Sequence, residues 1–523
     1  MAAIVTDQFR ILNANNFVET VDDSANSYYI TLGLANPALA VGFGRTTTWN
    51  TDTPNPTDNF NYIDHSGDTQ IFGKKVTSAN IRRLITRRDW TQGTRYEMYR
   101  HDYSVTNPSP VSNSTRLYSS NYYVINKNFD VYICIDNGST GISSTGNASQ
   151  DEPLFTDLEP SRAGESGDGY VWKYLFTVPP SDIIKFDSTE YISVPSNWPT
   201  SNTLQIQSVR ENGDSTVNNN QIKKVYIDKQ GLGYSPNISG LEVNILGDGT
   251  GGKVVVDTNN LGKITSATVS AGGQGYSYGM IDLGTINAGV TTTNAAKLIP
   301  IIPPSNGHGY DLYKELGADK VLVYARFDDS TKDFPIDTKF AQIGIIKNPN
   351  QAGSSTTVFT EAKFSSLSGI KFSSVSGTLP TAGNIIRQTV ANTNTAKGYV
   401  ASYDAETKVL KYFQDRSLFF NGDTDDQTDF VGVSTSSKIE AFESSANPVT
   451  TLQGFTGTVD TTFTDSKVNP TGSKVISLDT EFTSGLSIPE INKGTGDIIY
   501  IDNRPLISRN ARHKEDIKVI LEF

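Results

Sequence analysis

The stretch FDVYICID at residues 129–136 carries the pattern that decides the fold. Its odd-numbered positions are all apolar, so they share one face of a β-strand, in which side chains alternate between two faces. The run Tyr122–Ile125 precedes it, and the polar link Asn126–Asn128 joins the two runs. This arrangement predicts a β-hairpin.

The same alternation recurs farther along the chain. The last seven residues, IKVILEF at 517–523, place apolar side chains on one face and predict a C-terminal strand. Gly398–Tyr403 and Lys408–Phe413 flank the polar loop Asp404–Thr407, which predicts a second hairpin. β-Structure is therefore expected in several separate parts of the chain.

Helices are expected to be few and short. Helix signals occur over Ala79–Thr86 and Tyr310–Leu316, and Gly317 ends the second. The predicted fold class is mainly β, with a multi-domain β-sandwich body, two inserted small β domains and few short helices.

Length and composition support several modest domains. At 523 residues, a prior of about 150 residues per domain gives about three to four. Charged residues make up 19%, below the usual ~25%, and Ser, Thr, Asn and Gly fill the difference. These residues favour turns and strands over long helices. The 24 Phe, 24 Tyr and 4 Trp supply large side chains for cores, so disorder is not indicated.

Two segments differ from the rest of the chain in their sequence pattern or composition, and they are interpreted as inserted β domains. Residues 203–300 contain a loose repeat that ends in G-x-G-Y-S, with an offset of 42 residues between Gly233 and Gly275. Residues 352–485 are rich in Ser, Thr, Gly and Asp. The body is then expected to comprise residues 1–202, 301–351 and 486–523.

The net charge and the residue counts argue against several classes of protein. The net charge of −12 argues against nucleic acid as a partner, because an acidic chain is repelled by phosphate. No apolar run approaches ~18 residues and the start lacks a signal-peptide pattern, so no membrane span or secretory signal is expected. One cysteine, Cys134, and four histidines leave little for a disulfide framework or a metal site. No cofactor, metal or small-molecule substrate is expected.

Two stretches resemble binding loops. Gly247–Lys253 satisfies G-x-G-x-x-G, but a β run at Val254–Asp257 follows where a phosphate site needs a helix, so a hairpin turn is expected. The second is an acidic cluster whose spacing is somewhat like that of an EF-hand calcium loop. Such a loop needs Gly at its sixth position and Glu at its twelfth, but this chain has Thr428 and Ser434 there. A solvated loop is therefore favoured over a calcium site. Its acidic residues are Asp423, Asp425, Asp426 and Asp429.

Two further groups could carry chemistry. His308 lies in a Gly-rich loop and could be a general base. No serine nucleophile in a G-x-S-x-G turn accompanies it. A turn or a helix cap by Asn306 or Asp311 is therefore favoured. Glu165 and Asp168 are the best candidates for a carboxylate pair of the kind that cleaves glycosides. A turn is favoured there because Gly167 and Gly169 flank Asp168 and suit positive φ.

A basic cluster with aromatic neighbours runs from Arg82 to Tyr96. Arg beside Trp and Tyr can form a nucleic-acid patch or a protein interface. The acidic chain favours an interface or an internal ion pair, and a local Arg88–Asp89 pair is the alternative to an interface role.

Several short motifs follow one another along the chain. They are AIVTDQFR at 3–10, FGRTTTW at 43–49, RRDW at 87–90, TRY at 94–96, GDGYVWKYLF at 167–176, PP at 179–180, EYI at 190–192, VP at 194–195, FAQIGIIKNP at 340–349 and IYIDNRP at 499–505. In this order they resemble one family, the baseplate wedge subunit of T-even-type contractile-tail phages, a dimeric β-sandwich protein. The resemblance covers somewhat over half of the chain, and both inserts depart from it.

The resemblance implies a non-enzymatic structural protein of the virion tail baseplate, assembled in the host cytoplasm. It implies a homodimer that scaffolds other wedge proteins and relays the trigger for sheath contraction. Residues expected to act as structural or interface determinants are Arg87, Arg88, Asp89, Trp90, Asn503, Arg504 and Pro505.

Two other function classes remain open from the sequence. A receptor- or glycan-binding tail protein is the first, because Tyr234 and Tyr276 of the repeat could stack on sugars. A polysaccharide-cleaving enzyme is the second, with Glu165 and Asp168 as its candidate carboxylates.

Overall fold

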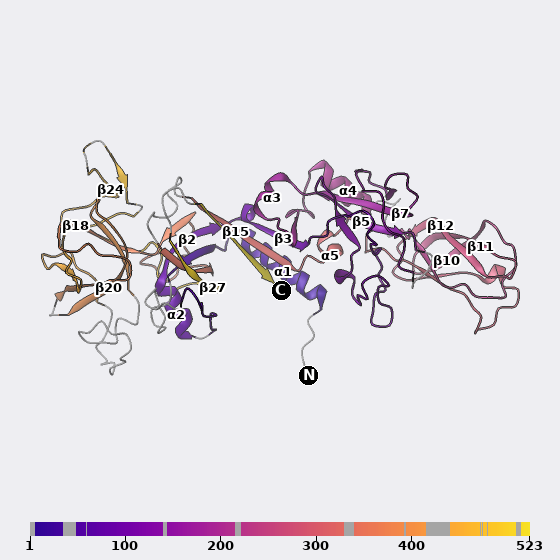
Figure 1. Ribbon diagram of the computed structural model, residues 1–523, viewed down its shortest axis with the longest axis horizontal. Helices are drawn as coiled ribbons and strands as arrows, with labels where there is room; N and C mark the ends of the chain where they lie inside the picture. Colours follow the sequence, from indigo (N-terminus) through magenta and orange to yellow (C-terminus); the bar gives the residue numbers. More distant parts are fainter. Residues whose placement is uncertain are drawn as a thin grey trace. The chain divides into compact units, whose positions relative to one another are not determined.

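The protein is described by a computed structural model, shown with its element labels in Figure 1. The structure describes residues 6–34, 49–58, 60–139, 144–214, 221–328, 339–391, 394–414, 440–470, 472, 474–478, 480–508 and 514–523. Strands far outnumber helices in these ranges, so the prediction of a mainly β fold with few helices is confirmed.

The chain forms two compact units. Unit 1 comprises Met1–Val18, Ile81–Val323 and Val519–Phe523, and unit 2 comprises Glu19–Asn80 and Tyr324–Lys518. Each unit therefore combines segments that are distant in sequence. The five-segment division into body and inserts stays a prediction.

The hairpin predicted around residues 122–136 is confirmed in unit 1. β4 (Tyr123–Ile125) pairs antiparallel with β5 (Asp130–Asn137), and β5 pairs with β7 (Tyr170–Thr177). β6 (Ser161–Arg162) completes a sheet of order β4-β5-β7-β6. Both faces of β5 are buried, Cys134 included, so this strand lies inside the core of unit 1.

The helix predicted over Ala79–Thr86 is wrong. Ser78–Asn80 forms a single 3-10 turn, and β3 (Ile81–Thr86) follows it. β3 pairs with β8 (Tyr191–Val194) on one side and with β15 (Lys320–Asp328) on the other. Pairing on both sides, together with β-branched residues, outweighs the local helix signal.

The C-terminal strand is confirmed as β28 (Lys514–Glu522). It joins a sheet of order β28-β15-β3-β8. Ile517 and Val519 are buried while Lys518 and Ile520 between and after them are exposed, which matches the predicted alternation.

The helix predicted over Tyr310–Leu316 is confirmed as α5 (Leu312–Leu316). The Asp311 side chain caps it by accepting a hydrogen bond from Lys314 N, and Gly317 ends it with φ of 70°. α3 (Pro180–Lys185) and α4 (Leu204–Asp214) are also in unit 1.

Helix α1 (Asp7–Asp22) was not expected from the sequence. Its buried residues Ile11, Ala14, Val18 and Val21 are spaced by three or four, as the inward face of a helix requires. Polar residues throughout the segment mask this narrow apolar stripe.

Residues 222–302 build small sheets with a separate hydrophobic core. β10 (Leu241–Gly247), β11 (Thr250–Thr258), β12 (Ile264–Gln274) and β13 (Gly279–Ile281) form a sheet of order β12-β11-β10-β13. β9 (Val225–Lys229) pairs with β14 (Lys297–Pro300).

Unit 2 contains a five-stranded antiparallel sheet of order β17-β2-β1-β16-β27. Helix α2 (Phe60–Thr69) leads directly into β2. The strands are β1 (Tyr28–Gly33), β2 (Gln70–Val76), β16 (Lys339–Lys347), β17 (Lys363–Ser365) and β27 (Asp497–Ser508).

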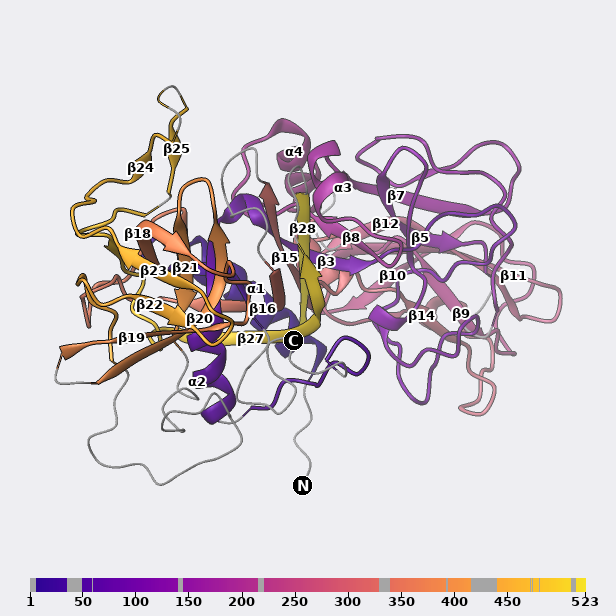
Figure 2. The ribbon, with the colours of Figure 1, turned by 60° about the vertical axis from the view of Figure 1, so that its left-hand side comes forward.

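A second sheet of unit 2 closes on itself because β18 pairs with β21 as well as with β23. The hairpin predicted around 404–407 is confirmed as β20–β21. A small hairpin of β24 (Lys467–Val468) and β25 (Ile476–Ser477) extends from this sheet (Figure 2). The strands of the sheet are β18 (Ser368–Ser376), β19 (Ile385–Thr389), β20 (Thr395–Asp404), β21 (Val409–Phe413), β22 (Val449–Thr451), β23 (Thr456–Val459) and β26 (Leu486–Ser487).

Candidate functional site

The segment 87–90 continues from β3 and is bound to strand β4 through its backbone. Ile125 N donates to Arg88 O at 2.8 Å, and Trp90 N donates to Ile125 O at 2.9 Å. The Trp90 indole donates to Ser149 Oγ at 3.1 Å. The backbone of the segment is therefore fixed on the core of unit 1.

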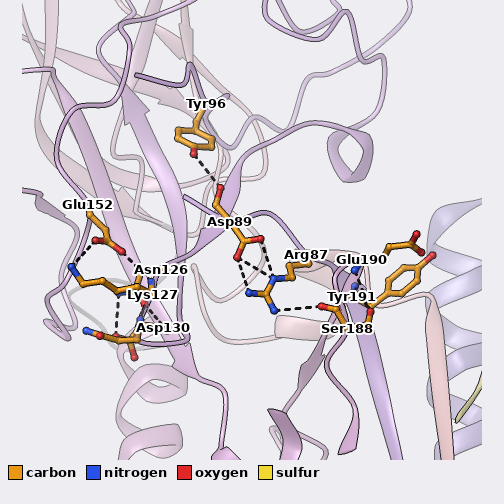
Figure 3. Close-up of polar contacts among 11 residues, drawn as sticks. Arg87, Asp89, Tyr96, Asn126, Lys127, Asp130, Glu152, Ser188, Glu190 and Tyr191 are labelled. Carbon is orange, nitrogen blue, oxygen red and sulfur yellow. Dashed lines mark hydrogen bonds and ion pairs between the residues drawn. The ribbon is translucent and has the colours of Figure 1, made fainter. Parts of the chain in front are cut away.

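Arg87 and Asp89 form a forked ion pair (Figure 3). Arg87 Nε and Nη2 donate to the Asp89 carboxylate at 2.9–3.0 Å. These hydrogen bonds raise the pKa of Arg87 above its ordinary value. The sequence suggested Arg88 as the partner of Asp89, whereas the structure pairs the carboxylate with Arg87, because neighbouring side chains in an extended segment point to opposite sides.

Arg88 turns toward the interior instead. Its Nη2 donates to Tyr118 O at 3.1 Å, and its guanidinium lies 4.5 Å from the ring centroid of Tyr123. A cation over an aromatic face is attracted by the ring quadrupole. Arg88 therefore stabilises unit 1 from within.

The motifs at 94–96 and 167–176 meet in the same core. Tyr96 N donates to Tyr170 OH at 2.8 Å. The ring of Trp172 stacks on Tyr170, with centroids 5.4 Å apart, and meets Tyr96 edge-on at 5.7 Å. All three side chains are buried. These motifs form a packed aromatic cluster.

The turn expected at Gly167-Asp168-Gly169 is confirmed. Gly167 and Gly169 have φ of 71° and 88°, which glycine adopts without steric cost. The Asp168 carboxylate accepts hydrogen bonds from Tyr170 N at 2.9 Å and Gln150 N at 2.8 Å. Asp168 thus organises backbone, which supports a turn rather than a carboxylate pair with Glu165.

Asn503 lies in β27 of unit 2 and is buried. Its side-chain oxygen accepts from Gln342 Nε2 at 2.9 Å, and its Nδ2 donates to Pro54 O at 2.8 Å. The amide therefore joins β27, β16 and the segment that follows Trp49.

Arg504 and Pro505 form a bulge at the edge of this sheet. Gln342 stands opposite Asn503 and Phe340 opposite Ile507, so residues 504–506 face a single residue of β16. Trp49, which is fully buried, donates its indole N–H to Arg504 O at 2.9 Å. Proline is tolerated at such edge bulges because it has no N–H to contribute to the ladder.

The predicted site residues thus fall into two clusters. Cluster 1, residues 87–90 with their contacts, belongs to unit 1, and cluster 2, residues 503–505 with theirs, belongs to unit 2. Trp49 and Gln342, which hold cluster 2 together, come from two other motifs of the sequence.

The Gly-rich stretch 247–253 contains the turn of the β10–β11 hairpin, as expected, and runs on into β11. Asp248 in this turn accepts from Ser277 N at 2.9 Å, and hydrogen bonding from Ser277 lowers the pKa of Asp248 to about 2. The acidic cluster at Asp423–Asp429 lies outside the described residues.

His308 pairs with Glu315 rather than with Asp311. His308 Nδ1 lies 2.5 Å from Glu315 Oε1, and both side chains are buried. Glu315 also accepts from Gly309 N at 2.7 Å. Asp311 caps α5, as the helix-cap interpretation expected.

The two tyrosines suggested for sugar stacking are both buried. Tyr234 OH accepts from Ala296 N at 2.9 Å, and Tyr276 OH donates to Ile245 O at 2.9 Å. Their rings pack in the small core of residues 222–302, so neither face is available to a glycan.

Within the described ranges, no three His, Cys, Asp or Glu side chains gather as a metal site would require. Among the helices described, none has both the length and the apolar character needed to cross a membrane.

Sequence reasoning missed an open depression of about 630 Å³ beside Trp90. Lys127, Asp151, Glu152 and Leu154 also line it. The signal available in the sequence was the density of acidic residues between 151 and 168, with leucines among them.

Two comparisons with known proteins show what this chain is similar to. The family model described as Bacteriophage T4, Gp8, matches residues 139–232. The baseplate wedge protein gp8 of Enterobacteria phage T4 is 30% identical over 224 residues, which cover 38% of this chain and 61% of that protein. The match thus spans about three fifths of the relative's length, and both findings confirm the resemblance to T4-type baseplate wedge subunits.

Proposed function

We propose that this chain is a structural component of a contractile-tail baseplate wedge, because it is similar to the baseplate wedge protein of phage T4. The observation that carries the proposal is the 30% identity over 224 residues. The proposed place of the protein is the tail baseplate of the virion, and its proposed role is non-enzymatic.

The geometry of the two clusters supports a structural role. Polar side chains of the motifs contact other parts of the same chain, as the Arg88–Tyr118 hydrogen bond and the Gln342–Asn503 amide pair illustrate. Groups engaged in this way hold distant segments together. A catalytic site would instead orient such groups toward a space that a substrate can enter.

We further propose that the protein scaffolds other wedge proteins and relays the trigger for sheath contraction. Sheets with packed cores move as rigid bodies, whereas contacts between bodies can be exchanged for others. Such a protein can therefore hold its neighbours in one arrangement and release them into another. One test uses tails in which introduced cysteines form disulfide bonds between this chain and a neighbouring wedge protein. Contraction should be blocked until the disulfides are reduced. Contraction without reduction would contradict the relay.

A homodimer is part of the same proposal. Light scattering at micromolar concentration should give about twice the 56.9 kDa of the chain. A stable monomer at that concentration would remove the dimer from the proposal and leave the baseplate role standing.

Loss of the protein tests the baseplate role. Host cells infected with virus that lacks this chain should accumulate incomplete baseplates and no contractile tails. Normal tails, or a defect confined to heads, would contradict the proposal.

A further inference from the structure

The open depression beside Trp90 lies in unit 1, next to cluster 1. Its lining includes the apolar side chains of Trp90, Phe155 and Ala163, and Leu154, which also lines it, is 49% exposed. Aromatic side chains in such hollows are typical anchors of protein interfaces.

The walls of the depression are fixed by hydrogen bonds. Glu152 accepts from Lys127 N at 3.0 Å and forms an ion pair with Lys127 Nζ at 3.0 Å (Figure 3). The Phe155 ring meets Tyr132 edge-on at 5.5 Å, and Phe155 O accepts from Tyr132 OH at 2.6 Å. The hollow is therefore largely preformed, which lowers the entropic cost of binding.

The segment that supplies one wall, Asp151–Asp168, is strongly acidic. It contains six carboxylates and one arginine, a formal charge of −5. Lys127 neutralises Glu152, and Lys223 lies 3.7 Å from Glu159. Among the described residues, no ion-pair partner is found for the remaining four carboxylates, which are Asp151, Asp157, Glu165 and Asp168.

Two carboxylates line the depression itself, those of Asp151 and Glu152. Hydrogen bonds from Ser166 lower the pKa of Asp151 below its usual range. Asp157 and Glu165 lie in the same segment and are exposed to solvent. A partner that reaches the depression therefore meets acidic side chains beside apolar ones.

We propose that this depression and the acidic segment Asp151–Asp168 that supplies part of its lining are a docking surface for a basic segment of another wedge protein, anchored by an apolar or aromatic side chain. The inference rests on the proposed function for the identity of the partner. Charge complementarity selects a basic segment, and the apolar lining at Trp90 and Leu154 selects the anchor. Nucleic acid is disfavoured because its phosphates would face the carboxylates.

Charge reversal tests the electrostatic half of the proposal. The double variant Asp157→Lys, Glu165→Lys changes exposed residues that no ion pair holds, so folding should be unaffected. Its incorporation into tails, in competition with the unchanged protein, should fall about tenfold, because like charges then face a basic partner. The matched control is Glu190→Lys, Glu481→Lys, which alters two exposed acids elsewhere and makes the same change in net charge.

Each outcome separates the inference from the proposed function. If both variants enter baseplates as well as the unchanged protein, the docking surface is wrong and the baseplate role stands. If both are equally depleted, net charge rather than this surface is responsible, and the inference is also overturned. If the unchanged protein is absent from baseplates, the proposed function itself fails.

Crosslinking tests the identity of the partner. A photo-crosslinking residue in place of Leu154, in the full chain within intact tails, should label another wedge protein within a segment of net positive charge. Labelling of a second copy of this chain, of an acidic segment, or of nucleic acid would overturn the proposal. The control is the same crosslinker in place of Leu261, which is 62% exposed in a different part of unit 1 and should label a different segment.

Discussion

Cluster 1 and cluster 2 each hold an irregular segment next to a strand, but they do so with different kinds of contact. Cluster 1 adds ionic groups to the backbone hydrogen bonds that fix the segment after β3, namely the Arg87–Asp89 pair and the Arg88 guanidinium over Tyr123. Cluster 2 fixes the bulge in β27 mainly with neutral groups, namely the Trp49 indole and the Gln342–Asn503 amide pair. Ionic contacts respond to salt and pH and neutral ones do not, so the two clusters should be separable by experiment.

The largest effect is expected from Trp49→Ala in cluster 2. The fully buried ring leaves a cavity and Arg504 O loses its donor, so the free energy of unfolding of unit 2 should fall by about 3–5 kcal/mol. Hydrogen exchange of the β27 amides should measure the loss. Trp90→Ala in cluster 1 is the matched control, and because Trp90 is only half-buried its cost should be about 1–2 kcal/mol. Equal costs would contradict the assignment of Trp49 as the centre of cluster 2.

The amide pair of cluster 2 should give the next largest effect. Asn503→Ala leaves Gln342 Nε2 and Pro54 O without their partner, which should cost about 2–3 kcal/mol. Gln342→Ala should cost less. The double variant should be more stable than the sum of the two losses predicts, by about 1 kcal/mol, because both changes remove one shared bond. Strict additivity would show that the two amides do not interact.

A buried ammonium in β7 should make unit 1 sensitive to pH. Burial lowers the pKa of Lys173 to about 8, and its Nζ donates to Leu158 O at 2.6 Å. Between about pH 8 and the unfolded lysine pKa of ~10.4, the unfolded chain binds more protons than the folded protein, so stability rises with pH across this window. Below about pH 8 the cost of burying the charge is fully present.

The variant Lys173→Met tests this window. The free energy of unfolding of the unchanged protein should rise relative to that of the variant by about 3 kcal/mol across it. Parallel pH profiles, measured by denaturant unfolding, would show that the ammonium is not desolvated in the fold.

The smallest effect is expected from Asp89→Asn. The Asp89 side chain is 57% exposed, so solvent screens its pair with Arg87 and the loss should be below about 1 kcal/mol. The loss should shrink further as salt is added, whereas the cost of Asn503→Ala should not change. A salt-independent loss at Asp89 would point to its backbone contacts instead of its charge.

Local patterns predicted the parts of the fold that short-range physics decides. The alternation at 129–136 and at the C-terminus identified β5 and β28, and Gly317 marked the end of α5. The segment 81–86 was mistaken for a helix because its pairing partners, β8 and β15, lie more than 100 residues away in sequence. Tertiary pairing of this kind leaves no local signal.

The candidate residues were found in the sequence, but their partners were not. Trp49 and Arg504 are 455 residues apart and meet only in the folded sheet. Which arginine pairs with Asp89 depends on the direction of two adjacent side chains. The buried positions of Tyr234 and Tyr276 follow from the packing of the small sheets around them, which a repeat pattern does not reveal.

Cryo-electron microscopy of intact tails from the virus that encodes this protein tests the central claim most directly. The account predicts density for unit 1 and unit 2 within each wedge of the baseplate, in contact with other wedge proteins. Absence of the chain from the particle, or density only at the tip of a receptor-binding fibre or in the head, would contradict it.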